Sequence, residues 1–438
     1  MKHIAVIGAG ITGITTCYSL LQRGYKVTVF DKNRYAAMQT SFANGGQLSA
    51  SNAEVWTQVS TIAKGIKWML KKDAPLLVNP RPDWHKYSWM AEFISHIPHY
   101  EKNTIASARL AIAAREHLFS WAQKEHIDFD LQSRGILHIY KDKAGFEHGQ
   151  RVNTLLARGG LERREVSVEE MQAIEPTLRG NLYAGMFTQS DSTGDIHKYT
   201  RGLADACLRQ GARFIYDSAV QTLRHMGTQV RVDYAQSGSA NTETDIFDAI
   251  VVCAGIDSRL LAAQLGDRVN IYPVKGYSIT VNLQDTKSCE SAPWVSLLDD
   301  DAKLVTSRLG DNRLRIAGTA EFNGENYDIR DDRIRPMINW CRHYFPEANT
   351  EHVVPWAGLR PMMPDMMPKV GAGKLPGVYY NTGHGHLGWT LSAATAEMVG
   401  DVVAQSLPVT PKASPVVTEF ASRRHEENRK AAGQGTKG

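Results

Sequence analysis

The stretch HIAVIGAGITG at residues 3–13 decides the fold. The apolar run HIAVI at 3–7 is typical of a buried strand and leads directly into Gly8-x-Gly10-x-x-Gly13. The residues from about Ile11 to Arg23 are spaced as in a helix. Gly24 ends this helix, KVTVF at 26–30 indicates a second strand, and Asp31 comes next. This order, completed within about 30 residues, is typical of a unit that binds a dinucleotide.

The glycines and the aspartate have separate tasks in such a unit. Gly8 permits the tight turn, Gly10 lets the backbone approach a pyrophosphate, and Gly13 lets the helix pack on the strand. The first turn of the helix offers free N–H groups to the phosphates, and Asp31 is expected to accept hydrogen bonds from a ribose. A glycine-rich turn without a ligand is the alternative, and the complete context disfavours it.

Composition narrows the class of protein. The chain has 438 residues and a formal net charge of +4, with 42% hydrophobic and 22% charged residues. These values are ordinary for a folded globular protein and exclude disordered, collagen-like and coiled-coil classes. The charge is too small to indicate nucleic-acid binding, so we expect no nucleic-acid partner.

The cysteines are five in number, lie far apart and form no C-x-x-C pair. We therefore expect neither a zinc ribbon nor a redox dithiol, and we interpret the cysteines as free thiols in a reducing compartment.

Residues 4–22 carry no charge and resemble a signal peptide. Because they contain the fingerprint, we predict that they are folded structure.

Two features favour FAD over NAD as the dinucleotide. A cluster of small hydrogen-bonding groups, Thr40, Ser41 and Asn44-Gly45-Gly46-Gln47, follows Asp31 and is suited to an extended cofactor. Near the C-terminus, VYYN at 378–381, the loop TGHGHLG and a helix from about 390 to 406 repeat the strand–loop–helix pattern. The start of that helix is suited to stabilise negative charge on a reduced flavin.

Further strand and helix patterns place this cofactor unit in a larger fold. A helix is expected at about 199–209, DAIVVCAG at 248–255 indicates a buried strand entering a glycine turn, and residues 270–322 alternate as strands do. We predict an α/β protein with a Rossmann-like FAD-binding domain and a discontinuous α+β substrate domain. The expected FAD-binding segments are 1–75, 190–268 and 352–410, the substrate segments are 76–189 and 269–351, and 411–438 is a polar tail.

The motifs taken together resemble a known family. Beyond the fingerprint and the 40–47 cluster, they are PVKGYS at 273–278, GLRP at 358–361, NTGHG at 381–385 and Gly388-Trp389. Over about residues 2–405 the chain resembles the bacterial D-amino acid dehydrogenase small subunit, within the glycine oxidase and D-amino acid oxidase superfamily. The resemblance implies oxidation of a free amino acid, a D-amino acid being favoured. Hydride would pass from Cα to FAD, water would give a 2-oxo acid and ammonia, and the electrons would go to a quinone.

Two alternatives stay open at this point. One is an amino- or imino-acid oxidase that uses oxygen, similar to glycine oxidase. The other is a nucleotide-binding module without catalysis, which Arg360 and the C-terminal glycine loop argue against. We expect the FAD to be noncovalent, because none of the cysteines lies in a segment expected against the flavin ring.

The candidate site residues fall into two groups. Arg360 and Tyr277 are the candidate catalytic residues, since a guanidinium can hold a substrate carboxylate by two parallel bonds and a phenol can hydrogen-bond the same group. The structural alternatives are an ion pair for Arg360 and a core position for Tyr277. The candidate cofactor residues are Gly8, Gly10, Ile11, Thr12, Gly13, Asp31, Lys32, Thr40, Ser41, Asn44, Gly45, Gly46, Gln47, Val220, Ala254, Gly255, Gly383, His384, Gly385, Gly388, Trp389 and Thr390.

Histidines, methionines and a lysine near the candidate site carry no clear functional signal in the sequence. We expect no metal at His384 and His386, because no carboxylate or cysteine lies near them in sequence. Met362, Met363, Met366 and Met367 are either core methionines or an adaptable apolar wall of the substrate pocket. Lys275 lies in the same motif as Tyr277 and could as easily be solvated. No feature identifies a general base.

A basic amphipathic helix is expected at residues 56–72. Apolar residues share one face, and Lys64, Lys67 and Lys71 share another. Such a helix can lie on an anionic membrane or pack on its own domain. Apart from residues 4–22, no stretch approaches the ~20 apolar residues needed to span a bilayer. We therefore expect the protein on the cytoplasmic side, soluble or peripherally attached to the inner membrane.

Overall fold

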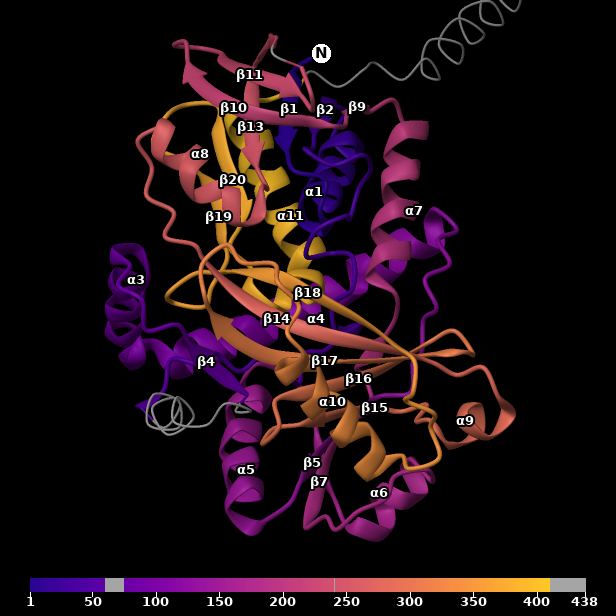
Figure 1. Ribbon diagram of the computed structural model, residues 1–438. Coiled ribbons are helices and arrows are strands. Elements are labelled where there is room, and N and C mark those ends of the chain that lie inside the picture. The colour runs from indigo at the N-terminus through magenta and orange to yellow at the C-terminus, as the bar shows by residue number, and fades with distance from the viewer. Residues whose placement is uncertain (60–74, 240, 410–438) are drawn as a thin grey trace, which may run out of the picture.

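The computed structural model describes residues 1–59, 75–239 and 241–409. Residues 60–74 contain most of the expected helix at 56–72, and 411–438 are the expected tail, so both predictions lie outside the described residues. Figure 1 shows one sheet with its helices in the upper part of the molecule and a second sheet in the lower part, whose long strands lie across the middle.

The upper part contains a six-stranded sheet with the fingerprint at its centre. Its strand order is β19-β20-β13-β1-β2-β9, and all neighbouring strands are parallel except β19 and β20. The bounds are β1 (His3–Ile7), β2 (Lys26–Phe30), β9 (Arg213–Ile215), β13 (Ala249–Val252), β19 (Lys369–Ala372) and β20 (Val378–Thr382). The fully buried runs of β1, β13 and β20 fit a parallel sheet that is covered on both faces.

Each face of this sheet has its own cover. On one face, α1 (Ile11–Gln22), α7 (Ile196–Arg209) and α11 (Gly388–Ser406) form one core with the sheet. On the other, α8 (Ser258–Gln264) packs with the three-stranded antiparallel sheet β10 (Ser218–His225), β11 (Val230–Gln236) and β12 (Thr242–Phe247). This arrangement is the Rossmann-like unit that the sequence predicts.

The lower part is built on a nine-stranded mixed sheet. Its path is β18-β14-β17-β16-β15-β5-β7-β6, and β4 pairs with β17. The bounds are β4 (Leu76–Val78), β5 (Ile136–Tyr140), β6 (Arg164–Val166), β7 (Ala184–Thr188), β14 (Tyr272–Asn282), β15 (Ser296–Asp299), β16 (Leu304–Leu309), β17 (Arg313–Phe322) and β18 (Val353–Met362). One face forms a core with α10 (Asp331–Tyr344), which lies below the sheet in Figure 1.

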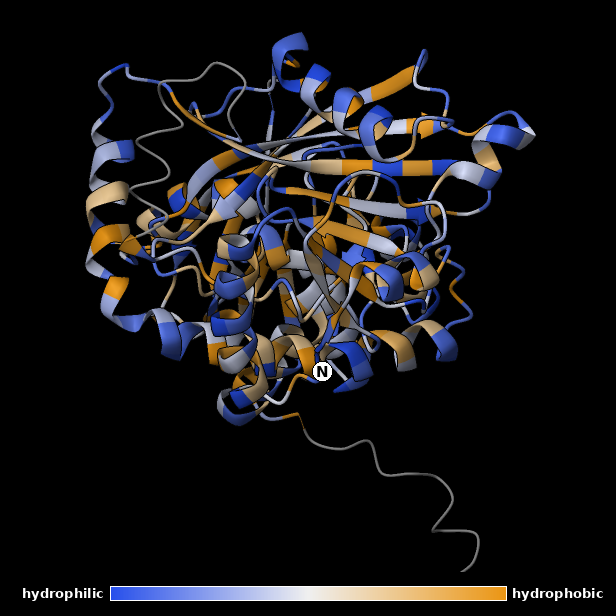
Figure 2. Cartoon of the chain, turned by 90° about the horizontal axis from the view of Figure 1, so that it is seen from below, coloured by the Kyte–Doolittle hydropathy of each residue, from blue (hydrophilic) through white to orange (hydrophobic). Residues whose placement is uncertain are grey.

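Helices and short elements complete the fold. They are α3 (Trp84–Ser95), α4 (Tyr100–Lys124), α5 (Lys143–Arg158), α6 (Val168–Ile174), α9 (Thr286–Ser291), the pair β3 (Gln47–Leu48) and β8 (Ser192–Thr193), and the single turns η1 (Ile97–His99), η2 (Gly255–Asp257) and η3 (Gly385–Leu387). Figure 2 shows helices at the rim that carry hydrophilic and hydrophobic bands side by side. Such banding lets a helix cover a core with one side while the other meets water.

Two segments lie with a different part of the fold than the expected boundaries assign. Strand β18, expected with the cofactor domain, pairs with β14 in every register position from Tyr272↔Met362 to Val281↔Val353. The end of α4, expected with the substrate domain, contributes Leu118 and Trp121 to the core of α1 and α11. In both cases a tertiary contact outweighs proximity along the chain. For β18 this contact is the long backbone ladder with β14, and for α4 it is the apolar contact with α1 and α11.

Candidate active site

The fingerprint forms the turn that its glycines predict. Gly8 has a φ of +107°, and a Cβ atom on Gly13 would stand 1.8 Å from the Gly8 carbonyl oxygen. Gly10 differs, because a Cβ there would meet only the Ser41 hydroxyl, at 3.5 Å. Gly13 is therefore required for packing, whereas Gly10 keeps open the space in front of the helix.

The start of α1 is prepared for an anion. Gly10 is the N-cap and offers no side chain, the first turn carries no acid, and the Ser41 hydroxyl accepts a hydrogen bond from the Ile11 amide at 3.0 Å. Asp31, at the end of β2, accepts hydrogen bonds from the amides of Ala9 at 2.6 Å and Asn33 at 2.8 Å. These bonds fix the carboxylate beside the turn, where the sequence expects it to meet a ribose.

A cavity of about 430 Å³ opens in front of this turn. Most of the predicted cofactor residues line it: Gly8, Gly10, Ile11, Thr12, Asp31, Lys32, Thr40, Ser41, Val220, Ala254, Gly255, Gly383, His384, Gly385 and Gly388. They come from chain segments that lie far apart in the sequence and meet at the carboxyl ends of β1, β2, β13 and β20. This is where open α/β sheets bind their ligands.

A second cavity, of about 250 Å³, adjoins the first. The two share Ile11, Thr40, Ser41, Gly385 and Gly388 in their walls. The remaining predicted cofactor residues that line a cavity, Asn44, Gly45, Gln47, Trp389 and Thr390, lie here. Gly13 and Gly46 line neither, since Gly13 packs on Gly8 and Gly46 packs on Ser307 of β16.

Arg360 of β18 lines the second cavity, and no carboxylate of the described residues pairs with its guanidinium. Its guanidinium donates to the backbone carbonyls of Thr319 at 2.8 Å and Gly318 at 3.4 Å. Within the described part of the chain it forms no ion pair, so the structural alternative of an internal ion pair finds no support. Burial lowers the pKa of Arg360 to about 10, which leaves the group charged at neutral pH.

Backbone geometry explains how Arg360 is held. Strand β17 shifts register against β14 between Lys275 and Tyr277, and Thr319 adopts a φ of 57° at that irregularity. A β-bulge of this kind frees carbonyls from the ladder. On the other side, a Cβ at Gly276 would stand 2.2 Å from a guanidinium nitrogen of Arg360, so only glycine leaves room for this side chain.

Tyr277 occupies the opposite face of β14. Because Arg360 pairs with Val274 and side chains alternate along a strand, the Arg360 side chain shares a face with Val274 and Gly276, and not with Tyr277. The Tyr277 hydroxyl donates to Glu321 at 2.7 Å. Although Tyr277 borders the cavity, its phenol and the guanidinium are not brought together, which disagrees with the expected shared role.

Lys275 is buried beside Tyr277 and is not solvated. Its Nζ lies 3.3 Å from a carboxylate oxygen of Glu321, and its exposure is 0%. The alternation of the strand therefore places a polar network on the side of the sheet that faces α10, while Arg360 stands on the cavity side.

The two histidines of the glycine loop, the buried His384 and the half-buried His386, are neutral at neutral pH. Burial lowers the pKa of His384 to about 3 and that of His386 to about 4. His384 donates to or accepts from Thr395, and its Nδ1 has no hydrogen-bond partner among the described residues. His386 stacks on Trp56 at 4.7 Å between ring centres in the second cavity, a role that the sequence did not reveal.

The methionine cluster belongs to the core. Met362 and Met366 pack with Trp89 and Tyr272, and Met363 lies against Gly383. The second cavity is lined instead by Glu54, Asp300, Lys303 and His148 beside Trp56. An apolar pocket wall of methionines is therefore not observed, and the wall is more polar than the sequence suggests.

Comparison with known proteins gives the family. The model described as DAO, FAD dependent oxidoreductase, matches residues 3–402. The chain belongs to this family. A D-amino acid dehydrogenase of Mesorhizobium japonicum is 62% identical over 93% of this chain and 98% of its own length. Another from Paramagnetospirillum magneticum is 40% identical over 91% and 94%. Glycine oxidase from Geobacillus kaustophilus has the same fold, with a TM-score of 0.72 at 18% identity over 94% and 97% of the two chains.

The residues of this FAD-dependent oxidoreductase fit FAD. Gly10 leaves open the space that a pyrophosphate needs. The N-cap residues of α1 and α11 provide no capping side chain, and Ile11 and Gly388 at the first positions of these helices line both cavities. The indole N–H of Trp389 and Nδ1 of His384 are buried and lack a partner in the described chain, as groups that meet a bound ligand do. The predicted cofactor and fold class are thus confirmed.

Among the described residues, no helix is long and apolar enough to cross a membrane.

Proposed function

We propose that this FAD-dependent oxidoreductase oxidises free D-amino acids to 2-oxo acids and ammonia. The observation that carries the proposal is Arg360, a half-buried cation that faces a cavity and has no acid partner in the described chain. A cation in this state requires an anion to offset its desolvation, and a substrate carboxylate supplies one. The two curated relatives, both D-amino acid dehydrogenases, support the choice of substrate class.

Around the second cavity, one side chain is expected to bind the substrate carboxylate and two backbone carbonyls orient that side chain. The planar guanidinium of Arg360 offers parallel N–H donors that match a carboxylate. The carbonyls of Gly318 and Thr319 hold its other donors, so the fork is oriented before substrate enters. A substrate that Arg360 holds by its carboxylate lies in the cavity that adjoins the cofactor cavity.

Oxidation removes a hydride from Cα and a proton from nitrogen, which leaves a C=N double bond. FAD supplies the acceptor for the two electrons. Hydride transfer requires the substrate amine to be neutral, and water then adds to the 2-imino acid to release ammonia. Trp56 and His386 stack on each other in the wall of the second cavity.

A quinone is the electron acceptor that we propose, with the protein attached peripherally on the cytoplasmic side of the inner membrane. Relatives named as dehydrogenases support an acceptor other than oxygen. The purified enzyme is expected to reduce a soluble quinone analogue with D-amino acid while consuming little oxygen. Oxygen uptake at a rate equal to quinone reduction would assign it to the oxidases instead.

Anaerobic mixing tests the proposed reaction directly. D-amino acids should bleach the flavin absorbance of the enzyme, and the matching L-amino acids should not. The Arg360→Ala enzyme, with the same flavin content, serves as the control and should bleach far more slowly. Equal bleaching by both enantiomers, or by both enzymes, would contradict the proposal.

We also expect the FAD to be released by acid precipitation. Cys253 is the cysteine that lines the first cavity, but its thiol contacts Thr16 and burial raises the pKa of the thiol to about 12. A thiol that stays protonated is a poor nucleophile. Yellow colour retained in the protein pellet would contradict this prediction.

A further inference from the structure

A buried ion pair lies on the side of β14 that the reaction does not use. Lys275 and Glu321 are 0% and 2% exposed, and their charged groups stand 3.3 Å apart on neighbouring strands. Removing two charges from water costs several kcal/mol per ion, so such a pair is weak evidence for a stabilising role. The contacts that it makes point to a different task.

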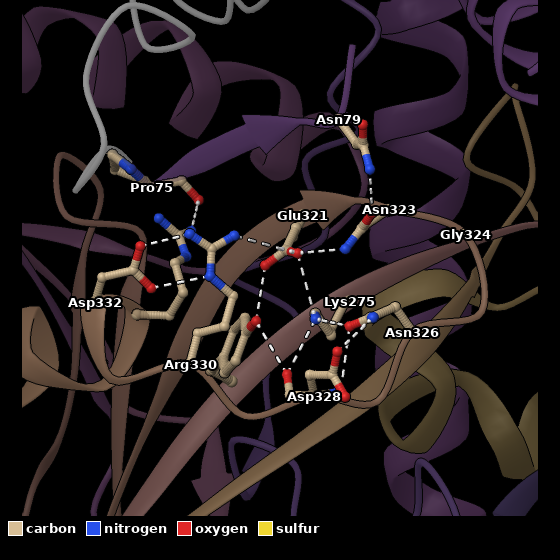
Figure 3. A network of polar contacts seen from close by, with 12 residues as sticks. Pro75, Asn79, Lys275, Glu321, Asn323, Gly324, Asn326, Asp328, Arg330 and Asp332 are labelled. Carbon is tan, nitrogen blue, oxygen red and sulfur yellow. Dashed lines mark hydrogen bonds and ion pairs between the residues drawn. The ribbon is translucent and has the colours of Figure 1, made fainter. Parts of the chain in front are cut away.

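The pair holds the loop that connects β17 to α10, as Figure 3 shows. The Lys275 ammonium donates to Asn326 Oδ1 at 2.6 Å and to the Asp328 carbonyl at 3.1 Å. Asn326 also accepts from the Asp328 amide at 3.2 Å. Both neighbours of Tyr327 are therefore fixed to one buried cation.

Tyr327 itself leaves the sheet and borders the cofactor cavity. Its side chain is 48% exposed and lines the first cavity together with Lys32 and Asp257. These two form an ion pair at 2.6 Å. Lys32, predicted from the sequence as a cofactor residue, therefore pairs with Asp257 and lines the cavity together with the tyrosine.

The end of the cavity that Tyr327 borders is the one near Asp31. Lys32 directly follows Asp31, the expected ribose acceptor, and Val220 and Leu260 line the same cavity. The aromatic face of a tyrosine is suited to a planar base, because every base has a face on which an aromatic ring can stack.

We propose that Tyr327 stacks on the adenine ring of FAD, and that the Lys275–Glu321 pair and Asn326 hold it in place. The loop after β17 then closes the cofactor cavity from the substrate sheet. Lys275, Glu321 and Asn326 are positioning residues, since they act through Tyr327.

Titration of full-length apoprotein with FAD and, separately, with ADP tests the contact. Tyr327→Ala should lower the affinity for both ligands by the same factor, about fivefold to a hundredfold for the loss of one stacked base. Tyr327→Phe keeps the ring and should stay within about twofold. Tyr183→Ala removes a tyrosine of similar exposure, 47%, that lines neither cavity, and should bind as the parent does.

The two ligands separate the possible outcomes. A loss for FAD with unchanged ADP affinity would place Tyr327 on the flavin half and overturn the proposal. Unchanged affinity for both ligands would overturn it as well. Neither outcome bears on amino-acid oxidation, which is measured independently with bound FAD.

A double-mutant cycle tests the positioning role. Asn326→Ala removes one of the two hydrogen bonds by which Lys275 holds the loop, while the bond to the Asp328 carbonyl stays. It leaves no buried carboxylate unpaired and should raise the rate at which the holoenzyme releases FAD. In that background Tyr327→Ala should have a smaller effect than in the parent, because the ring is held less firmly. Fully multiplicative effects would show that Asn326 does not act through Tyr327.

Discussion

At the scale of single residues, the planar guanidinium of Arg360 is expected to hold the substrate carboxylate. Arg360→Lys keeps the charge but loses the planar fork. Losing one or two charge-assisted bonds, at roughly 1.5–3 kcal/mol each, should lower kcat/KM by roughly tenfold to ten-thousandfold. Flavin content should stay unchanged, because Arg360 does not line the first cavity. Steady-state kinetics with D-amino acid measure the effect, and an unchanged kcat/KM would remove Arg360 from the substrate site.

Gly276 is a second single-residue determinant. In Gly276→Ala the new Cβ would stand 2.2 Å from the Arg360 guanidinium, so the guanidinium must move. We expect a higher KM for substrate and weaker binding of simple carboxylate inhibitors, with flavin content retained. Gly145→Ala is the matched control, because a Cβ there meets nothing closer than 3.4 Å. Equal KM values in the two variants would contradict the proposed spacing role.

At the scale of elements, two glycines in the turn between β1 and α1 are expected to have different roles, one in cofactor binding and the other in folding. Gly10 has ordinary strand-like angles, φ −72° and ψ 179°, and open space before it. Gly10→Val should therefore fold, with a normal circular dichroism spectrum, yet lack flavin absorbance. In Gly13→Ala the added Cβ collides with the Gly8 carbonyl, so both properties should be lost. Full flavin content in Gly10→Val would show that the turn does not face the pyrophosphate.

At the scale of the whole molecule, buried neutral histidines link stability to pH. Burial lowers the pKa of His384 to about 3, against about 6.5 in an unfolded chain. Between these values the unfolded state binds one more proton, so the free energy of unfolding falls as the pH falls below 6.5. The slope contributed by one histidine is about 1.4 kcal/mol per pH unit. Denaturant unfolding of the apoprotein between pH 7 and 5 should show a shallower slope in His384→Asn, by at most this amount because the limit is reached only well below pH 6.5. Equal slopes would contradict the assignment.

From the sequence alone the cofactor unit and the family could be predicted, and most of the predicted cofactor residues line the two cavities. Local spacing sufficed there, because a tight turn between a strand and a helix is built from neighbouring residues. The expected strand at 3–7 and the helix that begins at residue 11 coincide with β1 and α1. The GLRP motif likewise marked Arg360 before its surroundings were known.

Only the tertiary structure decided which groups meet across the sheets. The face of β14 that Tyr277 occupies depends on a register set by pairing with β18, and a shift of one residue would have reversed it. The bulge at Thr319, the room that Gly276 leaves and the tether of Tyr327 all join segments far apart in the chain. Local patterns carry no information on such pairings, because the free energy that selects them comes from packing the complete molecule.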